Sequence, residues 1–522
     1  MELLTDVIGQ PTPRPAVTED AITLPESKLE AEGHSALAAA VGGEHVSTER
    51  QVRLLHAGGK SYSDLVRLRS GDGSRAPDAV VFPGSHEEVM AVLRACADRG
   101  IAVVTFGGGT SVVGGVDNER GANAAVISLD VRRLNRVVSV DEDSMTATLE
   151  PGLRGPQVEE LLGEEGLTLG HFPQSFEHAS VGGWVATRSA GQASTGFGRI
   201  DDRVLGLRLA TPSGELRLSK NPSSAAGPDL IQLFVGSEGV YGVITEVTLR
   251  VFPKPKARQY EGWVFKEFAD GVAAFLELAQ RGLGPDISRL SDVDESTANL
   301  AMAGLEPRTK RVMDTYLRLR RTGPQPCMAI VGWEGTQAGV SARREAAAEA
   351  LGRHGGVRLG RRVGDSWEAH RYGGPRFRDT MMGLGVLAET LETATSWSNL
   401  DNLYEAVRTA ILDSLAAQGT PAYVMTHISH LYATGASLYF TVLARQVDGD
   451  EDALIEQWMT TKKAATQAIV AAGGTITHHH AVGQDHAAYL PDEVGPLGIK
   501  VLKAVKETLD PAGILNPGKL VP

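Results

Sequence analysis

Cysteine is nearly absent from this chain, because Cys96 and Cys327 are the only two thiols among 522 residues. Two such thiols provide neither a disulfide framework nor a cysteine metal site, and they are typical of a reducing compartment. A run of about 18 apolar residues, which a membrane-spanning helix needs, is also missing. The N-terminus has no basic stretch followed by an apolar one. Together these absences predict a cytoplasmic location.

Basic residues are fewer than acidic ones, 51 against 64, which gives a formal net charge of −13 at pH 7. This excess of negative charge works against general affinity for nucleic acids and for anionic membranes. We therefore expect no nucleic-acid partner. No basic amphipathic helix stands out in the sequence, so any association with a membrane surface is expected to be weak.

The length and the local patterns predict an α+β fold of several domains. Residues 1–76 are expected to form a partly helical extension. From residue 77 the pattern changes to strand, helix and strand, and this domain is expected to end at residue 255, because Pro253 and Pro255 break both helix and sheet. Long helices and strands then fill a second α+β domain over residues 256–493. A C-terminal segment covers residues 494–522.

Glycine is abundant, and 60 glycines without a repeating period indicate many tight turns or close backbone approaches. Three clusters of glycine and hydroxyl residues lie within about 140 residues of one another. They are Gly107 to Ser111, Ser180 to Gly191, and Gly236 to Glu246. The first follows a predicted strand, where backbone N–H groups can converge on a phosphate. It is neither a Walker loop nor the dinucleotide fingerprint, since no Lys-Ser/Thr pair follows Gly114 and Val112 replaces the third glycine.

A run of three histidines, His478 to His480, stands near the C-terminus. If the run is a strand, alternate side chains point to opposite faces, so His478 and His480 share one face and His479 lies on the other. Imidazoles can transfer protons at neutral pH. A metal site that adds His427, His430 and His486 is the alternative. We favour proton transfer and expect no metal.

The order of the three glycine clusters resembles the FAD-binding domain of the vanillyl-alcohol oxidase/p-cresol methylhydroxylase superfamily, from about residue 77 to residue 253. The resemblance implies a first loop that holds the pyrophosphate, a second that lines the flavin and ribityl chain, and a third that lies along the cofactor. It also implies that the C-terminal segment folds back onto the flavin. The implied FAD-binding residues are Gly107, Gly108, Gly109, Thr110, Ser111, Pro173, Ser175, Ser180, Gly182, Gly183, Ala186, Thr187, Glu238, Gly239, Val243, Ile244 and Asn516.

Members of the superfamily that attach FAD covalently often carry a histidine at the position of Thr110. Here that residue is threonine, and no cysteine lies near the three clusters. We therefore expect non-covalent FAD.

The C-terminal half resembles the alkyldihydroxyacetonephosphate synthase family more closely than the rest of the superfamily. The resemblance is carried by Thr477 to Gly483, by Ser437 to Phe440, by His427 to Ala436, and by the Phe172 to Glu177 and Gly182 to Arg188 segments. It implies a homodimer that acts on a lipid-like small molecule in ether lipid synthesis. The implied reaction exchanges the acyl group of acyl-dihydroxyacetone phosphate for a long-chain alcohol through a flavin N5 adduct, with no net oxidation.

The same resemblance implies roles for individual residues. Tyr439 would move the proton on substrate C1, and the histidine run, chiefly His479 and His480, would support proton transfer and the leaving carboxylate. Arg378 would lie near the flavin, Arg289 would match a second family arginine, and His430 would contact the substrate. After Gly483 the chain departs from the family pattern, since Gln484, Asp485 and His486 replace basic residues. An FAD-linked dehydrogenase or oxidase of a 2-hydroxy acid or alcohol is the alternative.

Overall fold

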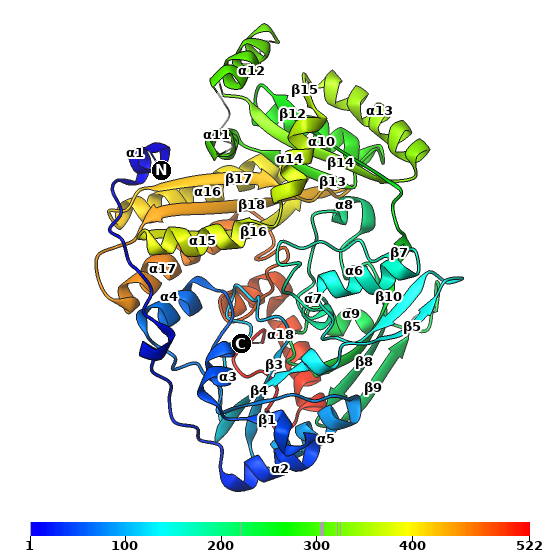
Figure 1. The fold of residues 1–522 in the computed structure, drawn as a ribbon, viewed down its shortest axis with the longest axis vertical. Coiled ribbons are helices and arrows are strands. Elements are labelled where there is room, and N and C mark those ends of the chain that lie inside the picture. Colours follow the sequence, from blue (N-terminus) through cyan, green and yellow to red (C-terminus); the bar gives the residue numbers. More distant parts are fainter. Residues whose placement is uncertain (1, 220, 303–306, 321, 324, 522) are drawn as a thin grey trace. The chain divides into compact units, whose positions relative to one another are not determined.

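The computed structural model describes residues 2–219, 221–302, 307–320, 322–323 and 325–521. The chain divides into two compact units (Figure 1). Unit 1 comprises residues 1–15, 191–198 and 253–478, and unit 2 comprises residues 16–190, 199–252 and 479–522. The second unit therefore consists of three stretches of chain that are far apart in the sequence.

Unit 2 contains a four-stranded sheet in the order β1-β2-β4-β3. Its strands are β1 (Val46–Ser47), β2 (Ala79–Val81), β4 (Ala125–Asp130) and β3 (Ile101–Phe106), and β2, β4 and β3 run parallel. Helices α2 (Ala31–Val41) and α5 (His86–Ala97) pack on this sheet through buried Leu37, Val89 and Leu93. Ser85 begins α5 by accepting a hydrogen bond from the Glu88 backbone N–H. The strand-helix-strand pattern read from the sequence is thus confirmed.

A second sheet of unit 2 is antiparallel, in the order β5-β6-β10-β8-β9. Its strands are β5 (Val137–Asp141), β6 (Thr146–Leu149), β10 (Val243–Arg250), β8 (Val204–Thr211) and β9 (Gly214–Ser219). The remaining elements of this unit that bear on the site are α6 (Gly155–Glu164), α7 (Val181–Ala186), α9 (Ile231–Phe234) and α18 (Leu490–Leu509). The chain end also joins the first sheet, because Leu515 forms a parallel bridge to Val103 in β3.

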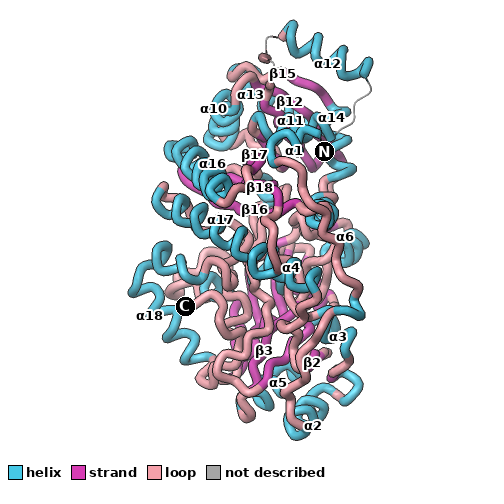
Figure 2. Tube along the Cα trace, turned by 90° about the vertical axis from the view of Figure 1, so that its left-hand side faces the viewer, coloured by secondary structure: helices cyan, strands magenta, loops and turns pink. Residues whose placement is uncertain are grey.

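Unit 1 is built on one sheet in the order β15-β12-β14-β13-β17-β18-β16 (Figures 1 and 2). Its strands are β12 (Ala257–Phe265), β13 (Ile287–Ser291), β14 (Cys327–Gly335), β15 (Val357–Gly360), β16 (Val386–Ser396), β17 (Ala422–Ile428) and β18 (Gly435–Arg445). Its helices are α1 (Glu2–Ile8), α8 (Ser194–Phe197), α10 (Phe268–Gln280), α11 (Val293–Met302), α12 (Pro307–Leu319), α13 (Gln337–Arg353), α14 (Arg361–His370), α15 (Gly374–Gly383), α16 (Leu400–Ala417) and α17 (Glu451–Ala471).

Strands β17, β18 and β16 present two chemically different faces. One face is apolar: Leu438, Phe440 and Val442 of β18 are buried, and the Phe440 ring lies 6.5 Å from the ring of Tyr404 in α16. Because successive strand residues point to opposite faces, Tyr439 lies on the other face. Helix α16 therefore packs on the Phe440 face of the sheet, and the Tyr439 face lies on the opposite side.

The compact units differ from the divisions expected from the sequence at several places, one of which is residues 191–198, expected in the domain of residues 77–255 but folded into unit 1. Residues 16–76, expected as an extension, fold into unit 2, and residues 1–15 fold into unit 1. Residues 479–493, expected in the second domain, belong to unit 2. The boundary expected at residue 255 lies close to the change of unit between Phe252 and Pro253. The other boundaries were not visible because they depend on long-range pairing, such as that of β1 with β2.

Candidate functional site

The three glycine clusters come together in unit 2. A Cβ on Gly107 would lie 2.2 Å from the Ser180 hydroxyl oxygen, and one on Gly108 would lie 2.1 Å from the His178 carbonyl oxygen. The first cluster is therefore pressed against the second, and only glycine fits there. The third cluster joins the second through a hydrogen bond from the Glu238 N–H to the Ala186 carbonyl, at 3.0 Å.

Asn516 fastens the C-terminal segment to these loops. Its side-chain amide donates to the carbonyl of Gly115 at 3.2 Å and to that of Glu238 at 2.6 Å. Its backbone N–H donates to Val103 in β3. Asn516 has a φ of 39°, a left-handed conformation that asparagine tolerates better than most residues. The C-terminal segment thus folds back onto the loops, while its contact with the flavin, and that of Asn516 with FAD, stays a prediction.

Three buried polar atoms around these loops fit an extended polar cofactor. The Thr105 hydroxyl, the Ser237 hydroxyl and the side-chain amide oxygen Oδ1 of Asn516 are buried and have no hydrogen-bond partner among the described residues. Buried polar atoms are normally hydrogen-bonded, so three such atoms at the loop cluster indicate a ligand that supplies the missing partners. The ribityl hydroxyls, phosphates and ring amides of FAD are groups of this kind.

Several predicted FAD-binding residues build the frame of this cluster. Ser180 begins α7, because its hydroxyl accepts a hydrogen bond from the Gly183 N–H. Thr187 ends α7 and donates from its hydroxyl to the Gly183 carbonyl. Pro173 and Ser175 lie in a turn that precedes α7, where the Pro173 carbonyl accepts from the Phe176 N–H. Their direct contact with FAD is untested.

Other predicted FAD-binding residues sit away from the loop tips or inside the first loop. Val243 and Ile244 open β10 and are buried, with Ala210 and Leu209 of β8 as ladder partners. Their packing is explained by the sheet alone, so their role toward FAD also stays a prediction. In the first loop, Ser111 accepts a hydrogen bond from the Gly115 N–H at 2.9 Å, which fixes the turn after Thr110.

The Glu238 carboxylate accepts hydrogen bonds from the protein backbone. Its two oxygens accept hydrogen bonds from the N–H groups of Val482 and Gly483, each at 2.8 Å. Burial raises the pKa of Glu238 to about 7, although these two hydrogen bonds and nearby Lys519 favour the ionised form. Glu238 thus anchors the segment that follows the histidine run, a role that the sequence did not indicate.

In unit 1, four strands bring polar side chains into one row on the face opposite α16. Ser291 of β13 pairs with His427 of β17, His427 pairs with Tyr439 of β18, and Tyr439 pairs with Glu392 of β16. Ser291, His427 and Glu392 are below 6% exposure, and Tyr439 is partly buried. Buried hydroxyl, imidazole and carboxylate groups are costly unless they are paired or used, so this row is the candidate site in unit 1.

Tyr439 is at the centre of the row. Its ring stacks on that of His427, with the centroids 4.8 Å apart. Burial, with smaller contributions from Glu392 and Glu389, raises the pKa of Tyr439 to about 12. Burial and the Arg289 charge lower the pKa of His427. At neutral pH the phenol therefore carries its proton and the neighbouring imidazole is uncharged.

The two predicted arginines differ in their relation to this row. Arg289 donates to the Glu295 carboxylate at 2.7 Å and lies 3.2 Å from His427 Nδ1, so it reaches the row. Arg378 donates to Glu389 at 2.8 Å. Glu389 is three residues from Glu392 on β16, so strand alternation directs the two carboxylates to opposite faces. The structure thus brings Arg289 beside Tyr439 but ties Arg378 to a different carboxylate.

The histidine run does not form a strand, and the alternation expected from the sequence is wrong. Residues 478–480 lie in a bend that follows Gly473 and Gly474, and Ala481 has a φ of 75°. His478 is held by a hydrogen bond from its backbone N–H to the Glu392 carbonyl. It is the last residue of unit 1, whereas His479 and His480 begin the third stretch of unit 2. The rings of His479 and His480 lie 4.7 Å apart.

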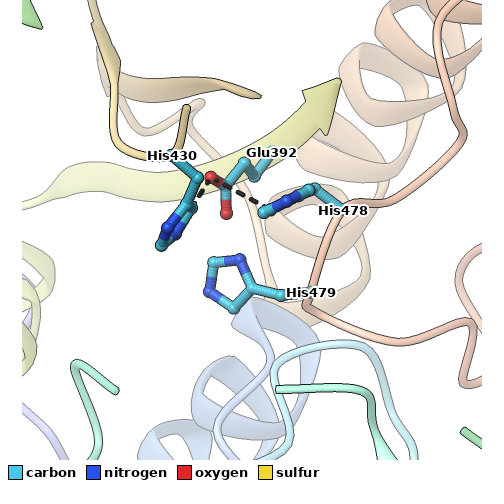
Figure 3. A group of neighbouring side chains, drawn as sticks. All are labelled: Glu392, His430, His478 and His479. Atoms are coloured by element: carbon cyan, nitrogen blue, oxygen red, sulfur yellow. Dashed lines mark ion pairs between the residues drawn. The ribbon is translucent and has the colours of Figure 1, made fainter. Parts of the chain in front are cut away.

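His478 and His430 converge on Glu392 (Figure 3). The Glu392 Oε1 atom lies 3.4 Å from His478 Nδ1 and 3.9 Å from His430 Nε2. The Tyr432 hydroxyl lies 2.7 Å from His478 Nε2. His427 and His486, which the sequence-based metal alternative grouped with His430, lie elsewhere: His427 binds Glu295 at 3.0 Å, and His486 Nδ1 lies 3.0 Å from the Ala481 carbonyl oxygen.

Sequence reasoning missed Glu392, Glu295 and Tyr432. Glu392 stands in the stretch Val386 to Ala394, which mixes apolar residues with threonines and Glu389, and a carboxylate within a strand is the signal that could have found it. Its partners could not be identified, because the pairing of β16 with β18 is a long-range contact.

Comparisons with known proteins agree with this arrangement. A family model described as "FAD binding domain" matches residues 77–219, and one described as "FAD linked oxidases, C-terminal domain" matches residues 254–520. The alkyldihydroxyacetonephosphate synthase of Dictyostelium discoideum is 33% identical over 92% of this chain and 79% of that protein.

Two solved structures show the same fold. An alkyldihydroxyacetonephosphate synthase superposes with a TM-score of 0.83 at 30% identity, over 99% of this chain and 91% of that chain. A p-cresol methylhydroxylase with substrate bound superposes with a TM-score of 0.69 at 16% identity, over 97% of this chain and 98% of that chain. The fold is thus the p-cresol methylhydroxylase type, the cofactor is FAD, and the chain belongs to the alkyldihydroxyacetonephosphate synthase family of FAD-dependent enzymes.

Proposed function

We propose that this enzyme exchanges the acyl group of acyl-dihydroxyacetone phosphate for a long-chain alcohol. The observation that carries the proposal is the polar row centred on Tyr439, in a chain 33% identical to a synthase of this activity. The acyl chain leaves as a carboxylate, the alcohol oxygen takes its place on C1, and the proton of the alcohol is released. FAD, held by the glycine clusters, would supply the flavin ring that activates C1 for this exchange, with no net change in oxidation state.

Tyr439 would carry the C1 proton in this reaction. A protonated phenol, with its pKa raised to about 12 by burial, can donate a proton but is a weak base on its own. The uncharged imidazole of His427, stacked on the phenol, or the Glu392 carboxylate opposite it would first take the phenol proton, so that the phenolate can accept the proton from C1. His479 and His480 would assist the leaving carboxylate, as the family resemblance implies.

Arg289 is the best-placed cation for the substrate phosphate. Its guanidinium is partly exposed, at 29% of the side chain, and offers several donors besides the one that binds Glu295. Arg378 is more deeply buried and bound to Glu389, so we assign it a supporting position.

The decisive experiment is an anaerobic flavin spectrum of the purified holoenzyme. With acyl-dihydroxyacetone phosphate and hexadecanol, free fatty acid and the ether product should accumulate in equal amounts, and the oxidised flavin band should be fully present once the substrate is exhausted, with no electron acceptor added. A panel of 2-hydroxy acids and alcohols should leave the band unchanged. Bleaching by a hydroxy acid, without ether formation, would instead establish the dehydrogenase or oxidase alternative, which the "FAD linked oxidases" family model keeps open.

A membrane surface would supply such lipid substrates, and we propose that α12 contacts it. Arg308, Arg311 and Arg318 are exposed on α12 and Arg320 follows it, while Val312 and Leu319 are 70% and 77% exposed. Leu317 packs against buried Val264 and Val357, so the helix is held by its opposite side. No helix among the described residues is long and apolar enough to cross a bilayer. Basic residues beside exposed apolar ones favour anionic lipid head groups.

The family resemblance also supports a homodimer in the cytoplasm as part of this proposal. Size-exclusion chromatography with light scattering would measure the oligomer, and a monomer at micromolar concentration would contradict it.

A further inference from the structure

We propose that His56 is a positioning residue for FAD, and that it acts on the first glycine cluster, where the pyrophosphate would bind. His56 directly follows α3 (Arg50–Leu55) in unit 2 and is 1% exposed. It lies outside residues 77–219, which the FAD-binding family model matches. The inference rests on FAD as the cofactor, and not on the reaction proposed above.

The partners of both ring nitrogens show that His56 carries two protons. Nδ1 lies 2.7 Å from the Val52 carbonyl oxygen, and Nε2 lies 2.8 Å from Oδ2 of Asp130. Although burial opposes it, hydrogen bonds from His56 and Arg132 lower the pKa of Asp130, so this carboxylate is ionised at neutral pH. A carbonyl oxygen and a carboxylate can only accept, so both nitrogens donate. The side chain is therefore a buried imidazolium.

This imidazolium leaves positive charge beside the first glycine cluster. Asp130 ends β4 and is paired in register with Phe106, which ends β3 and precedes Gly107. The single negative charge of Asp130 is shared between two cations, His56 and Arg132. The three charged side chains therefore have a net charge of one positive unit. Because the His56 charge is buried, salt screens it less than an exposed charge, and it favours a bound pyrophosphate.

A ring contact connects His56 to the glycine cluster itself. The centroid of the His56 ring lies 4.4 Å from that of Phe106, and a Cβ on Gly109 would lie 2.5 Å from Cζ of Phe106. The Phe106 ring thus touches both the imidazolium and the cluster. Successive glycines after a parallel strand let backbone N–H groups converge on a phosphate. A displaced Phe106 ring would shift these N–H groups, and this is the route by which His56 acts.

The chain around His56 is fastened to the same loop. The Lys60 N–H donates to the Ser111 carbonyl at 2.6 Å, and a Cβ on Gly59 would lie 2.5 Å from that carbonyl oxygen. The Asn118 side-chain amide donates to the His56 carbonyl at 2.7 Å. These contacts hold the backbone on both sides of the loop, so a change of the His56 side chain acts through Phe106 while the segment stays in place.

The rival explanation is that the pair of His56 and Asp130 only stabilises unit 2. Loss of one partner from a buried ion pair is destabilising wherever the pair lies. The two explanations differ in a measurable way. Positioning changes the affinity of the folded apoprotein for a pyrophosphate ligand, whereas a purely stabilising role changes only the free energy of unfolding.

The test measures FAD and ADP binding to apoprotein of the full chain. Quenching of flavin fluorescence reports FAD binding, and ADP, which has the pyrophosphate but no flavin, is measured as its competitor. We expect His56→Gln to weaken both ligands by the same factor, about 10- to 100-fold, because glutamine cannot replace two charged hydrogen bonds. Phe106→Leu should weaken both as well. The double variant should lose less than the product of the two factors, since both side chains act along one route.

His86→Gln is the matched control. His86 is a buried histidine of the same unit, and its Nδ1 lies 2.8 Å from the Thr245 hydroxyl in β10. Its substitution should lower the stability in urea but leave the FAD and ADP affinities within about 2-fold of those of the unchanged protein.

Nitrogen-15 NMR of histidine-labelled protein measures the charge separately. At pH 7 the unchanged protein should show an imidazole with two protonated nitrogens that is missing from His56→Gln. Circular dichroism identifies variants that do not fold, in which case Phe106→Leu decides. The proposal is overturned if that signal is absent, if ADP does not compete with FAD, if His56→Gln keeps both affinities or weakens FAD alone, or if His86→Gln weakens both ligands equally.

Discussion

Tyr439 lies directly between His427 and Glu392 in the sheet register, which makes it the clearest target for substitution. Tyr439→Phe removes only the hydroxyl and keeps the ring that stacks on His427. We expect the exchange rate to fall by roughly 10²–10⁴, the range for loss of an acid/base group. The measurement is kcat for ether formation, with flavin absorbance to confirm that FAD is retained.

Tyr423→Phe is the control for that substitution. Tyr423 precedes His427 on the same face of β17, but its hydroxyl donates to the Asp294 carbonyl. It should reduce the rate by less than about 3-fold. Equal rates for Tyr439→Phe and the unchanged enzyme would remove the acid/base role.

The raised pKa of Glu238 predicts that the stability of the fold depends on pH. Its folded pKa of about 7 lies above the ordinary value of 4.5, so the folded protein binds more protons than the unfolded chain between these pH values. The free energy of unfolding should therefore fall as pH rises from 4.5 to 7, by up to about 3 kcal/mol from this group. Urea unfolding at pH 5, 6 and 7 measures this slope.

Glu238→Gln removes the titrating carboxyl from that comparison. The slope of stability against pH should become flatter in this range, while the hydrogen bonds to Val482 and Gly483 are partly kept. An unchanged slope would mean that Glu238 stays ionised in the folded protein throughout, stabilised by its two N–H donors and Lys519.

At the scale of elements, strand β18 has Phe440 on its packed face and Tyr439 on the face of the candidate site. Phe440→Ala empties a fully buried position on the α16 side and should lower the free energy of unfolding by about 3–5 kcal/mol. Thr441→Ala, one residue along on the other face, should cost less than about 1 kcal/mol. Chemical denaturation monitored by circular dichroism checks both. A smaller loss for Phe440→Ala than for Thr441→Ala would contradict the assignment of faces.

Helix α12 predicts a salt-dependent contact with lipid. Replacing Arg311, Arg318 and Arg320 by glutamine should abolish sedimentation with vesicles that contain phosphatidylserine, since each basic residue contributes about 1 kcal/mol near such a surface. The matched control replaces Arg281, Arg353 and Arg361. None of them belongs to α12, and each forms an ion pair with Glu277 or Asp365. Equal loss in both triple variants, or binding to neutral vesicles alone, would count against α12.

Local patterns predicted many elements of this fold. The strand, helix and strand expected after residue 77 are β2, α5 and β3. These elements have regular apolar spacing and clear ends. The same reasoning was wrong for the histidine run, which was expected as a strand. Hydrogen bonds from the backbone N–H of His478 to Glu392 and from that of Val482 to Glu238 hold it in a bend. Those contacts join residues too distant in sequence for any local pattern to reveal.

The candidate site was predictable only in part. Tyr439, Arg289 and His430 were identified through the family resemblance, and the structure places them on or beside the same sheet face. Glu392 was missed, because its importance comes from strand register and not from its neighbours in the chain. The proposed lipid contact of α12 was not predicted, although Val312, Tyr316 and Leu319 recur at helical spacing, since the surrounding arginines resemble an ordinary solvated face.

For the whole molecule, FAD should stabilise unit 2 more than unit 1, because all three glycine clusters and Asn516 belong to unit 2. At a free FAD concentration 100 times its Kd, the gain is about 2.7 kcal/mol, or roughly 5–10 °C for a unit of this size. Calorimetry of apoprotein and holoprotein measures the shift, and Asn516→Ala should reduce it. An equal shift in every transition would mean that the units unfold together.

Alternate residues along β18 and β16 serve different purposes. One set packs against α16, whereas the other carries the Tyr439 row at its centre and buries Val386, Ala388 and Leu443 against Met381 and Ile8 at its end. A library that varies only Thr390 and Thr441 could explore new substrates while both packed regions keep their stability. The same division explains how a single architecture can be adapted by small steps, because a change at Thr390 or Thr441 need not be compensated anywhere behind the sheet.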